Sequence, residues 1–597
     1  MKTNIKPTTK HKEMGIFYTD KAIVDFIYSI IDIWKDDEDK NESRWLRHSP
    51  KPKYPSVIDP AVGEGVFLKE ALERSFTDKH HIFGIDLDEG AVERWKQIHL
   101  LKAFGGNEKD LEAHFFHQNG LDNIQWQQHI SKYKYQLRQD DIKNQQFDLV
   151  IGNPPFGGSG IDMKTAPDSL LESLWSFEVL PEDVRENLVT KQQSQISLLE
   201  SESDKVVKTH EKVSKRLSSF PIEILFVEKF IKLAKPGGWV AIILPEGIFA
   251  NSNAHNVREF ITRHAKIEAI VSLPRDAFKN VGTNAKTNIL FLRKYGRKTE
   301  EQQNYDVFLA SVSKTTAEIF NNITKQYFEY YGGNMVNPVQ IIKDQDGKEQ
   351  GIVRIDKNIQ DLMSEKPFSR WEVKYWHPKY DTMVTSLRRL SKDVQLRTYV
   401  STLTSGYRGS INFSKTGLPA IKVRNVMDVG IDISDTDYLD ENSPAVTELK
   451  KVHKGDIIIN RSGSGSIGRM AVYTQEKPAV ITGDVYLLRV KNISPEYVTV
   501  FLKSELGQQQ IQRFETGVSG QTKVDLDDIL SIYLPHIEEL ERLIVNNFAQ
   551  IDSNFQEAQL HDRKSSKYTS AIKKAEEILN ETVLSLNNYF LTTENRD

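Results

Sequence analysis

The chain has 597 residues, with 79 Lys and Arg against 83 Asp and Glu, a net charge of −4 and no cysteine. This length predicts several domains, each with an ample core. The near balance of charge excludes a polybasic protein that binds polyanions through bulk charge, but it leaves room for a local basic face. The missing cysteine excludes disulfides, cysteine-ligated metals and catalysis by a thiolate.

No segment approaches the roughly 18 consecutive apolar residues that span a bilayer. Residues 1–15 are polar and Lys-rich and lack the apolar core of a secretion signal. We therefore expect a soluble cytoplasmic protein that has no membrane partner and binds no metal.

Up to about residue 296, short apolar runs alternate with helical stretches. The runs lie at residues 56–59, 82–86, 148–152, 239–244, 269–273 and 288–292. This alternation predicts an α/β fold with a doubly wound, largely parallel sheet. Residues 159–220 are dominated by Glu, Lys, Ser and Gln, and we expect this insertion to lie outside the core.

The second half of the chain has short β-like runs broken by Gly and Ser, then apolar residues at helical spacing such as Leu540, Ile544, Phe548 and Ile551. We predict a β-rich α+β domain followed by long helices. The expected divisions are a first domain at 1–315, a connector at 316–370, the β-rich domain at 371–538 and the helical segment at 539–597.

Two segments near the N-terminus are typical of a nucleoside-binding turn. In the segment 57–68 a strand runs into a turn that contains Gly63 and Gly65, where glycine lets backbone amides approach a ligand closely. A second strand ends in Asp86, which lies 27 residues after Asp59. In doubly wound folds an acid at this place bonds ribose hydroxyls, so the spacing favours a nucleoside-containing cofactor over an ordinary turn.

The segment Asn153-Pro154-Pro155-Phe156 directly follows an apolar strand. Asn-Pro-Pro followed by Phe or Tyr arises by chance in roughly one chain of this length in a hundred. The two prolines make the turn rigid and leave its carbonyls free to accept hydrogen bonds, Asn153 adds a neutral acceptor, and Phe156 offers a planar face. Two acceptors before an aromatic ring suit an exocyclic amine on a flat ring.

Over about its first 300 residues the chain resembles the S-adenosylmethionine-dependent amino-methyltransferases that methylate adenine N6 in DNA. The resemblance implies a Rossmann-like methyltransferase domain in which Asn153, Pro154, Pro155 and Phe156 are catalytic. It also implies that the cofactor is held by Tyr18, Thr19, Asp59, Ala61, Gly63, Gly65, Asp86, Leu87 and Asn119. Asn119 stands where the family usually has an Asp that accepts from the adenine amine of the cofactor, and Phe278 is implied as a second plate against the substrate base.

The mechanism implied is direct transfer. Asn153 Oδ1 and the Pro154 carbonyl accept the two amine hydrogens and stabilise the charge that develops on the nitrogen. Because the amine is buried in duplex DNA, the base has to be flipped into the pocket, so another part of the protein has to hold the DNA.

Residues 371–538 resemble the target recognition domain of Type I restriction-modification specificity subunits, through segments such as 404–409, 418–425, 454–469 and 517–522. Between residues 391 and 430 there are six Lys or Arg against two Asp or Glu, an excess suited to phosphate contacts. The residues expected to contact DNA are Arg408, Lys422, Arg424, Asn425, Arg461 and Gln521. The terminal helices resemble the spacer helices of those subunits.

These features together predict a site-specific DNA adenine N6-methyltransferase of a restriction-modification or related defence system, with double-stranded DNA as its partner. Two chains pairing through the terminal helices would read a two-part palindrome, and a monomer would read an asymmetric site. We find no nuclease motif, so cleavage would come from a separate restriction subunit. Methylation of cytosine N4, of RNA bases or of a glutamine amide stays open, as does a DNA-binding assembly subunit without catalysis.

Overall fold

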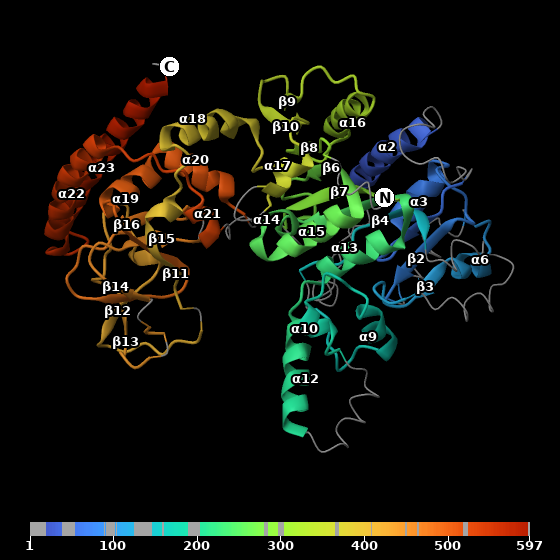
Figure 1. Ribbon diagram of the computed structural model, residues 1–597, viewed down its shortest axis with the longest axis horizontal. Coiled ribbons are helices and arrows are strands. Elements are labelled where there is room, and N and C mark those ends of the chain that lie inside the picture. Colours follow the sequence, from blue (N-terminus) through green and yellow to red (C-terminus); the bar gives the residue numbers. More distant parts are fainter. Residues whose placement is uncertain are drawn as a thin grey trace. The chain divides into compact units, whose positions relative to one another are not determined.

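The computed structural model of the chain describes residues 19–38, 54–88, 90, 102, 104–123, 146–157, 160–188, 203–279, 285–296, 304–364, 369–407, 409–443, 445–447, 450–462, 465–516 and 523–594. The chain folds into two compact units, Met1–Val373 and Lys374–Asp597 (Figure 1).

A ten-stranded mixed sheet forms the centre of the first unit, in the order β3-β2-β1-β4-β5-β7-β6-β8-β10-β9. Among these strands, β7 and β10 run antiparallel to their neighbours and the others share one direction. The strands are β1 (Val57–Asp59), β2 (Ile82–Asp86), β3 (Phe115–His117), β4 (Phe147–Gly152), β5 (Ala234–Pro245), β6 (Ala265–Ser272), β7 (Thr287–Lys294), β8 (Phe308–Val312), β9 (Val339–Lys343) and β10 (Glu349–Arg354). The doubly wound α/β fold expected from the alternating apolar runs is confirmed.

Helices cover both faces of this sheet. The central strands are apolar almost throughout, as strands buried on both faces must be. The helices are α2 (Lys21–Glu38), α3 (Val66–Glu73), α6 (Glu108–Ala113), α9 (Asp168–Leu174), α10 (Glu182–Arg185), α12 (Ser203–Ser218), α13 (Ile222–Leu233), α14 (Gly247–Ala250), α15 (His255–His264), α16 (Ala317–Tyr331) and α17 (Ile359–Ser364). One core cluster joins α2, α3 and α16 to the sheet, while α13 and α15 pack on β4, β5 and β6.

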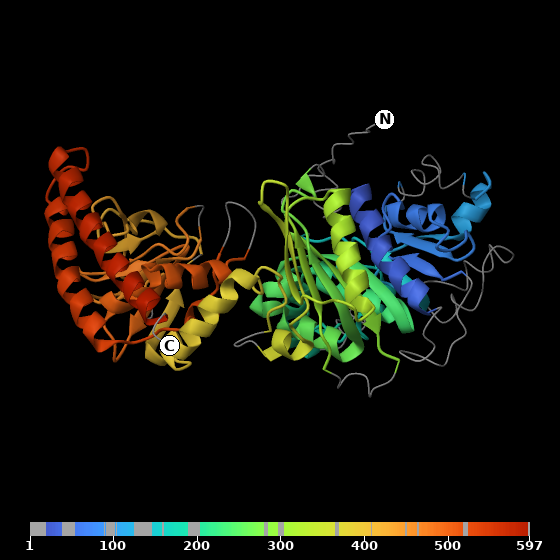
Figure 2. The same ribbon diagram turned by 90° about the horizontal axis from the view of Figure 1, so that it is seen from above.

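The range 316–370, expected to be a connector, is part of the first unit. Helix α16 lies beside α2 (Figure 2), and the hairpin β9–β10 extends the sheet beyond β8. The buried indole of Trp34 on α2 donates a hydrogen bond to the Tyr327 hydroxyl on α16 at 2.7 Å, across 293 residues of sequence. The connector interpretation was wrong because the partners of this segment lie far away in the chain.

The polar insertion is also more integrated than expected. Ile161, Leu170, Leu171 and Leu174 are buried, although α12 extends away from the sheet (Figure 1). The Glu228 carboxylate of α13 accepts the backbone N–H groups of residues 178 and 179, both at 2.9 Å. The expectation that the insertion lies outside the core was therefore wrong for residues 160–188.

The second unit contains two four-stranded sheets, β11-β18-β15-β16 and β13-β12-β17-β14. The strands are β11 (Val400–Ser405), β12 (Leu418–Ile421), β13 (Asp437–Leu439), β14 (Lys451–Val452), β15 (Ile457–Asn460), β16 (Met470–Val472), β17 (Ala479–Ile481) and β18 (Val485–Val490). The helices are α18 (Asp381–Ser391), α19 (Pro495–Lys503), α20 (Glu505–Phe514), α21 (Leu526–Leu530), α22 (Glu538–Gln559) and α23 (Ser566–Glu594).

Helices α22 and α23 pack against each other and against α19. The apolar residues whose spacing predicted long helices, including Leu540, Ile544, Phe548 and Ile551, are buried within this unit. Packing inside one chain therefore accounts for this periodicity.

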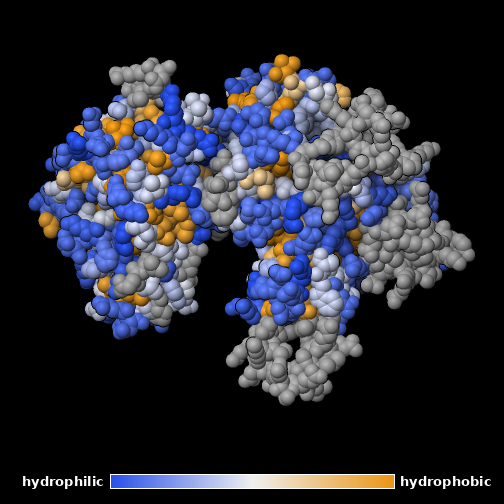
Figure 3. Space-filling model, viewed as in Figure 1, coloured by the Kyte–Doolittle hydropathy of each residue, from blue (hydrophilic) through white to orange (hydrophobic). Residues whose placement is uncertain are grey.

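The visible surface of both units is mainly hydrophilic, with small apolar patches (Figure 3). Among the helices that the structure describes, none combines the length and apolarity needed to cross a membrane.

The Trp34–Tyr327 hydrogen bond predicts a measurable loss of stability. Replacing Tyr327 by Phe leaves the buried indole N–H without its acceptor, which costs about 1–3 kcal/mol. We expect urea denaturation, followed by tryptophan fluorescence, to show this decrease in the free energy of unfolding. The control Phe328→Leu changes a residue of the same helix that is 61% exposed, and it should have little effect. Equal stabilities of Tyr327→Phe and the wild type would contradict the prediction.

Candidate functional site

A cavity of about 800 Å³ lies where β1, β2, β3 and β4 end, a size typical of small-molecule sites. These strands are parallel, so their carboxyl ends meet at one edge of the sheet. The turn between β1 and α3 contributes Gly63 (φ +48°) and Gly65 (φ +74°), whose left-handed conformations glycine adopts without steric cost. The structure thus brings the predicted turn to the cavity, which Gly63 lines.

Asp86 connects the ends of β1 and β2. One oxygen of its carboxylate accepts the Gly63 N–H at 2.7 Å and the other accepts the Asp88 N–H at 2.8 Å. These bonds hold the carboxylate beside the glycine turn, and each carboxylate oxygen accepts more than one hydrogen bond. The position and the chemistry of this acid fit a pair of ribose hydroxyls.

Asp59 lies at the base of the same turn and is almost fully buried. Burial raises the pKa of its carboxyl group well above the usual range, and the negative charge of Asp86 raises it further. Its Oδ1 accepts the Ala61 N–H at 2.9 Å. Asp59 therefore orders the first residues of the turn.

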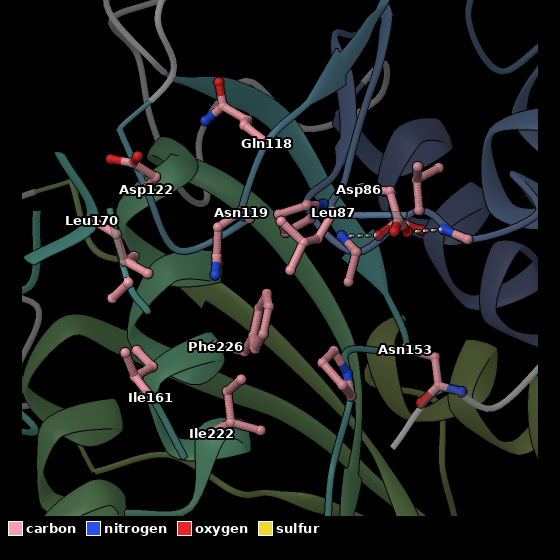
Figure 4. A pocket seen from close by; sticks show the side chains of 18 of the residues that line it. Asp86, Leu87, Gln118, Asn119, Asp122, Asn153, Ile161, Leu170, Ile222 and Phe226 are labelled. Atoms are coloured by element: carbon pink, nitrogen blue, oxygen red, sulfur yellow. Dashed lines mark hydrogen bonds between the residues drawn. The ribbon is translucent and has the colours of Figure 1, made fainter. Parts of the chain in front are cut away.

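Apolar side chains form the facing walls. Leu87, directly after Asp86, lines the cavity and is 54% exposed. Figure 4 shows Leu87, Asn119 and Phe226 gathered around one space, with Ile161 on its far side. A flat, largely apolar ring fits between Leu87 and Phe226.

Sequence reasoning gave no role to several residues that line this cavity. Phe226 belongs to α13, and the insertion supplies Ile161, Asp162 and Leu170. The signal for Phe226 was that residues 221–226 resemble a segment of the methyltransferase family, which by itself gave Phe226 no role. The insertion carried no such signal, because polar residues dominate its composition.

A buried polar network fixes the wall formed after β3. The Asp122 carboxylate accepts hydrogen bonds from Ser169 Oγ at 2.7 Å and Ser173 Oγ at 2.6 Å, which ties α9 to this turn. Lys229 Nζ of α13 donates to the Asp122 carbonyl at 2.8 Å. Burial lowers the pKa of the Lys229 ammonium to about 8, although the charge of Asp122 opposes this shift.

The turn after β4 reaches the same cavity through Asn153 and Pro155, and Thr19 lies opposite. Asn153 Nδ2 donates to Thr19 Oγ1 at 3.2 Å, and the other end of the amide carries the acceptor Oδ1. Glu223, at the start of α13, accepts a backbone hydrogen bond from Gly157, and burial raises the pKa of its carboxyl group. Glu223 therefore helps to position the turn.

Four predicted site residues that the structure describes do not line the cavity, namely Gly65, Pro154, Phe156 and Phe278. Phe278 is 1% exposed and belongs to the core cluster of the first unit, so its ring is not exposed to the cavity in this structure and its expected role as a plate against the base stays a prediction. Phe156 is 2% exposed, and its ring is covered by protein. Tyr18 lies outside the described residues.

The predicted DNA contacts in the second unit divide into four groups, of which buried Asn425 is the last. Lys422 and Arg424 share the Asp437 carboxylate, at 2.5 and 3.4 Å, and keep part of their side chains exposed. Arg461 is 14% exposed and lies between Asp484 and Asp525. Arg408 and Gln521 lie outside the described residues.

Asn425 was wrongly predicted to contact DNA, because its side chain is buried. Its Oδ1 accepts the Lys422 N–H and its Nδ2 donates to the Asp432 carbonyl, both at 2.9 Å. Both ends of the amide therefore support the local loop.

Within the part of the chain that the structure describes, no cluster of three or more His, Cys, Asp or Glu is arranged to hold a metal ion.

Two segments of the chain match protein-family models. Residues 199–331 match N-6 DNA Methylase, and residues 80–176 match Eco57I restriction-modification methylase. The chain is also similar to the Type I restriction enzyme EcoEI methylase subunit of Escherichia coli, with 24% identity over 301 residues, 49% of this chain and 45% of that protein. The chain thus spans about half the length of this curated relative.

Solved structures that resemble this chain include two restriction-modification enzymes. The Type IIL enzyme MmeI, in complex with DNA, has a TM-score of 0.48 and 12% identity over 98% of this chain and 78% of that chain. The Type IIG restriction endonuclease BpuSI has a TM-score of 0.42 and 13% identity over 95% of this chain and 66% of that chain.

The lowered pKa of Lys229 predicts a pH-dependent contribution to stability. Native Lys229 loses its proton near pH 8, whereas the unfolded lysine keeps it up to about pH 10.5. Between these values the unfolded state binds more protons, so the free energy of unfolding of the wild type should rise relative to Lys229→Met, by up to about 1.4 kcal/mol per pH unit. Urea denaturation of both proteins at pH 7, 8, 9 and 10 measures this difference.

Lys294 also has a pKa lowered to about 8 by burial, but it is present in both proteins and its effect cancels in the comparison. A difference in the free energy of unfolding between the wild type and Lys229→Met that stays constant from pH 7 to pH 10 would contradict the lowered pKa of Lys229.

Proposed function

We propose that this chain transfers a methyl group from S-adenosylmethionine to adenine N6 in a specific DNA sequence, as the modification and specificity component of a restriction-modification system. The observation that carries the proposal is the Asn153–Phe156 turn, which opens at the end of β4 on the same cavity as the glycine turn and Asp86. The two family matches support it, because one includes this turn and Asp86 and the other includes Phe226.

Different cavity residues bind different parts of the cofactor. Asp86 accepts hydrogen bonds from the ribose hydroxyls, Leu87 and Phe226 enclose the adenine ring, and the turn at Gly63 allows close approach of the backbone. Thr19 lies beside Asn153, where we place the methionine end. S-adenosylmethionine, when bound, supplies an electrophilic methyl group on a positively charged sulfur.

The turn after β4 prepares the substrate nitrogen. With Nδ2 donating to Thr19 Oγ1, Asn153 can offer Oδ1 as an acceptor. Asn153 Oδ1 and the Pro154 carbonyl accept the two amine hydrogens, which favours a pyramidal nitrogen and stabilises its developing positive charge. Stacking of the base on Phe156 requires neighbouring side chains to move, because the ring is covered.

The second unit has the role of holding and reading DNA. A base that is extruded from the duplex costs a few kcal/mol, so contacts elsewhere have to retain the DNA. Lys422 and Arg424 are the described candidates that keep exposed charge, and Asp437 holds them together. Arg461, largely buried between two acids, fits a structural role better.

The oligomeric state and the partner subunits belong to the same proposal. A separate subunit would perform any cleavage. Homodimerisation through α22 and α23 stays a prediction, and sedimentation measurements of mass with and without DNA test it. A dimeric mass agrees with a palindromic site, and a monomeric mass agrees with an asymmetric one.

Replacing Asn153 by Ala should abolish methylation. Removing one acceptor of the reacting amine lowers the rate about 100-fold or more. Long-read modification sequencing of plasmid DNA from a methylation-deficient host should show N6-methyladenine at a defined motif with the wild type and none with the variant. The control Asn253→Ala changes an exposed asparagine of the same unit and should leave the mark intact.

Other sequencing outcomes separate the alternatives. N4-methylcytosine would identify the cytosine enzyme. The absence of any mark with the wild type, together with firm cofactor binding in calorimetry, would indicate a missing partner subunit or a substrate other than DNA. The absence of cofactor binding would favour a subunit without catalysis.

The double substitution Lys422→Gln and Arg424→Gln should weaken DNA binding and flatten its dependence on salt. Removing one cation that pairs with a phosphate reduces the slope of log K against log salt by about 0.9. Fluorescence anisotropy with labelled duplex at several salt concentrations measures this slope. The control Lys567→Gln and Lys574→Gln removes the same charge from the exposed face of α23. Equal slopes for the two double variants would exclude phosphate binding by Lys422 and Arg424.

A further inference from the structure

The side chain of Asn119 has a fixed orientation at the end of β3. Its Oδ1 accepts the backbone N–H of Leu121 at 2.9 Å. The Leu121 N–H needs an acceptor, so Asn119 directs Oδ1 toward it. The amide nitrogen of Asn119 therefore points away from the Leu121 N–H. Figure 4 shows this nitrogen directed into the space beside Phe226. Asn119 therefore presents a hydrogen-bond donor to the cavity.

The turn that carries Asn119 has little freedom to rearrange. The Asp122 N–H donates to the Asn119 carbonyl at 3.0 Å, and Lys229 holds the Asp122 carbonyl from α13. Gly120 packs so closely that a Cβ at this position would lie 1.9 Å from the Pro60 carbonyl oxygen. Reversing the Asn119 amide would place its NH₂ group against the Leu121 N–H, so the observed orientation is the stable one.

We propose that Asn119 selects the cofactor by donating a hydrogen bond to the N1 acceptor of its adenine ring, instead of accepting from the exocyclic amine. This inference rests on the proposed function, because it takes S-adenosylmethionine as the occupant of the slot between Leu87 and Phe226. The polarity of Asn119 is the reverse of the one that the family's usual Asp, which accepts from the amine, has at this position. An aspartate here would face the ring with an acceptor, whereas Asn119 faces it with a donor.

The reversed polarity determines which ring edges the pocket accepts. Adenine places N1, an acceptor, next to the amine, a donor. The Asn119 nitrogen, a donor, complements N1 and not the amine. A ring that carries a hydrogen on N1, as hypoxanthine does, would oppose one donor with another and be rejected.

Isothermal calorimetry on the full-length protein tests the inference with three related ligands. These are S-adenosylhomocysteine, its 1-deaza analogue, in which a C–H group replaces N1, and its 6-desamino analogue, which lacks the amine. We expect the 1-deaza analogue to bind at least about 10-fold more weakly than the parent, and the desamino analogue to bind within about 3-fold of it. The comparison uses only wild-type protein, so no variant has to fold.

The substitution Asn119→Asp should invert this order. The aspartate keeps an acceptor for the Leu121 N–H but turns its second oxygen to the ring, so the amine gains a partner and N1 loses one. The desamino analogue should then be the weaker ligand. The control Asn123→Asp places the same charge on a nearby exposed residue that does not line the cavity, and it should keep the wild-type order.

The outcomes separate this inference from the proposed function. If S-adenosylhomocysteine fails to bind the wild type, the proposed function itself is overturned. If it binds and the desamino analogue is the weaker of the two, Asn119 accepts from the amine, and only this inference fails. Equal affinities of the two analogues would also overturn the inference and leave the cofactor assignment standing.

Discussion

The hydrogen bond from the Gly63 N–H to the Asp86 carboxylate connects the two turns on which the cavity depends. It forms because β1 and β2 are parallel neighbours, with Asp59 opposite Gly84, so the residues after both strands emerge at one edge of the sheet. The turn after β4 joins them because β4 pairs with the other side of β1. The adjacent strands β2, β1 and β4 thus bring a carboxylate, a glycine turn and a proline turn together.

Much of this arrangement could be predicted from the sequence, because its signals are local. The apolar runs marked the central strands, and the spacing of 27 residues between Asp59 and Asp86 marked their shared edge. What could not be predicted depends on distant partners. The Asp-Gly turn at Asp346 and Gly347 joins β9 to β10, but only the pairing of β10 with β8 adds this hairpin to the sheet. Nothing near Tyr327 in sequence identifies Trp34 as its partner.

The same difference between local sequence signals and distant partners explains where the site predictions and the structure differ. Phe278 follows a strand, as a residue facing a ligand would, but the core around α2 and α16 covers its ring. Asn425 lies in a basic segment, yet its own loop uses both ends of its amide. Residues 160–170 were hidden by the polar composition around them, although a few apolar side chains suffice to build a cavity wall. Residue type and spacing identify candidates, and burial decides between them.

In the second unit, the exposed cations that we propose to contact DNA lie beside an acid. Lys422 and Arg424 are held together by Asp437, and the two cations hold the pKa of its carboxyl group below the usual range. For the proposed function, a phosphate has to compete with this carboxylate for the two cations, which weakens attraction to any duplex. Phosphate contacts carry no sequence information. When the neighbouring acid weakens them, contacts with base edges provide a larger share of the discrimination between DNA sequences. Retained acids beside the cations therefore suit a protein that has to find one sequence among many.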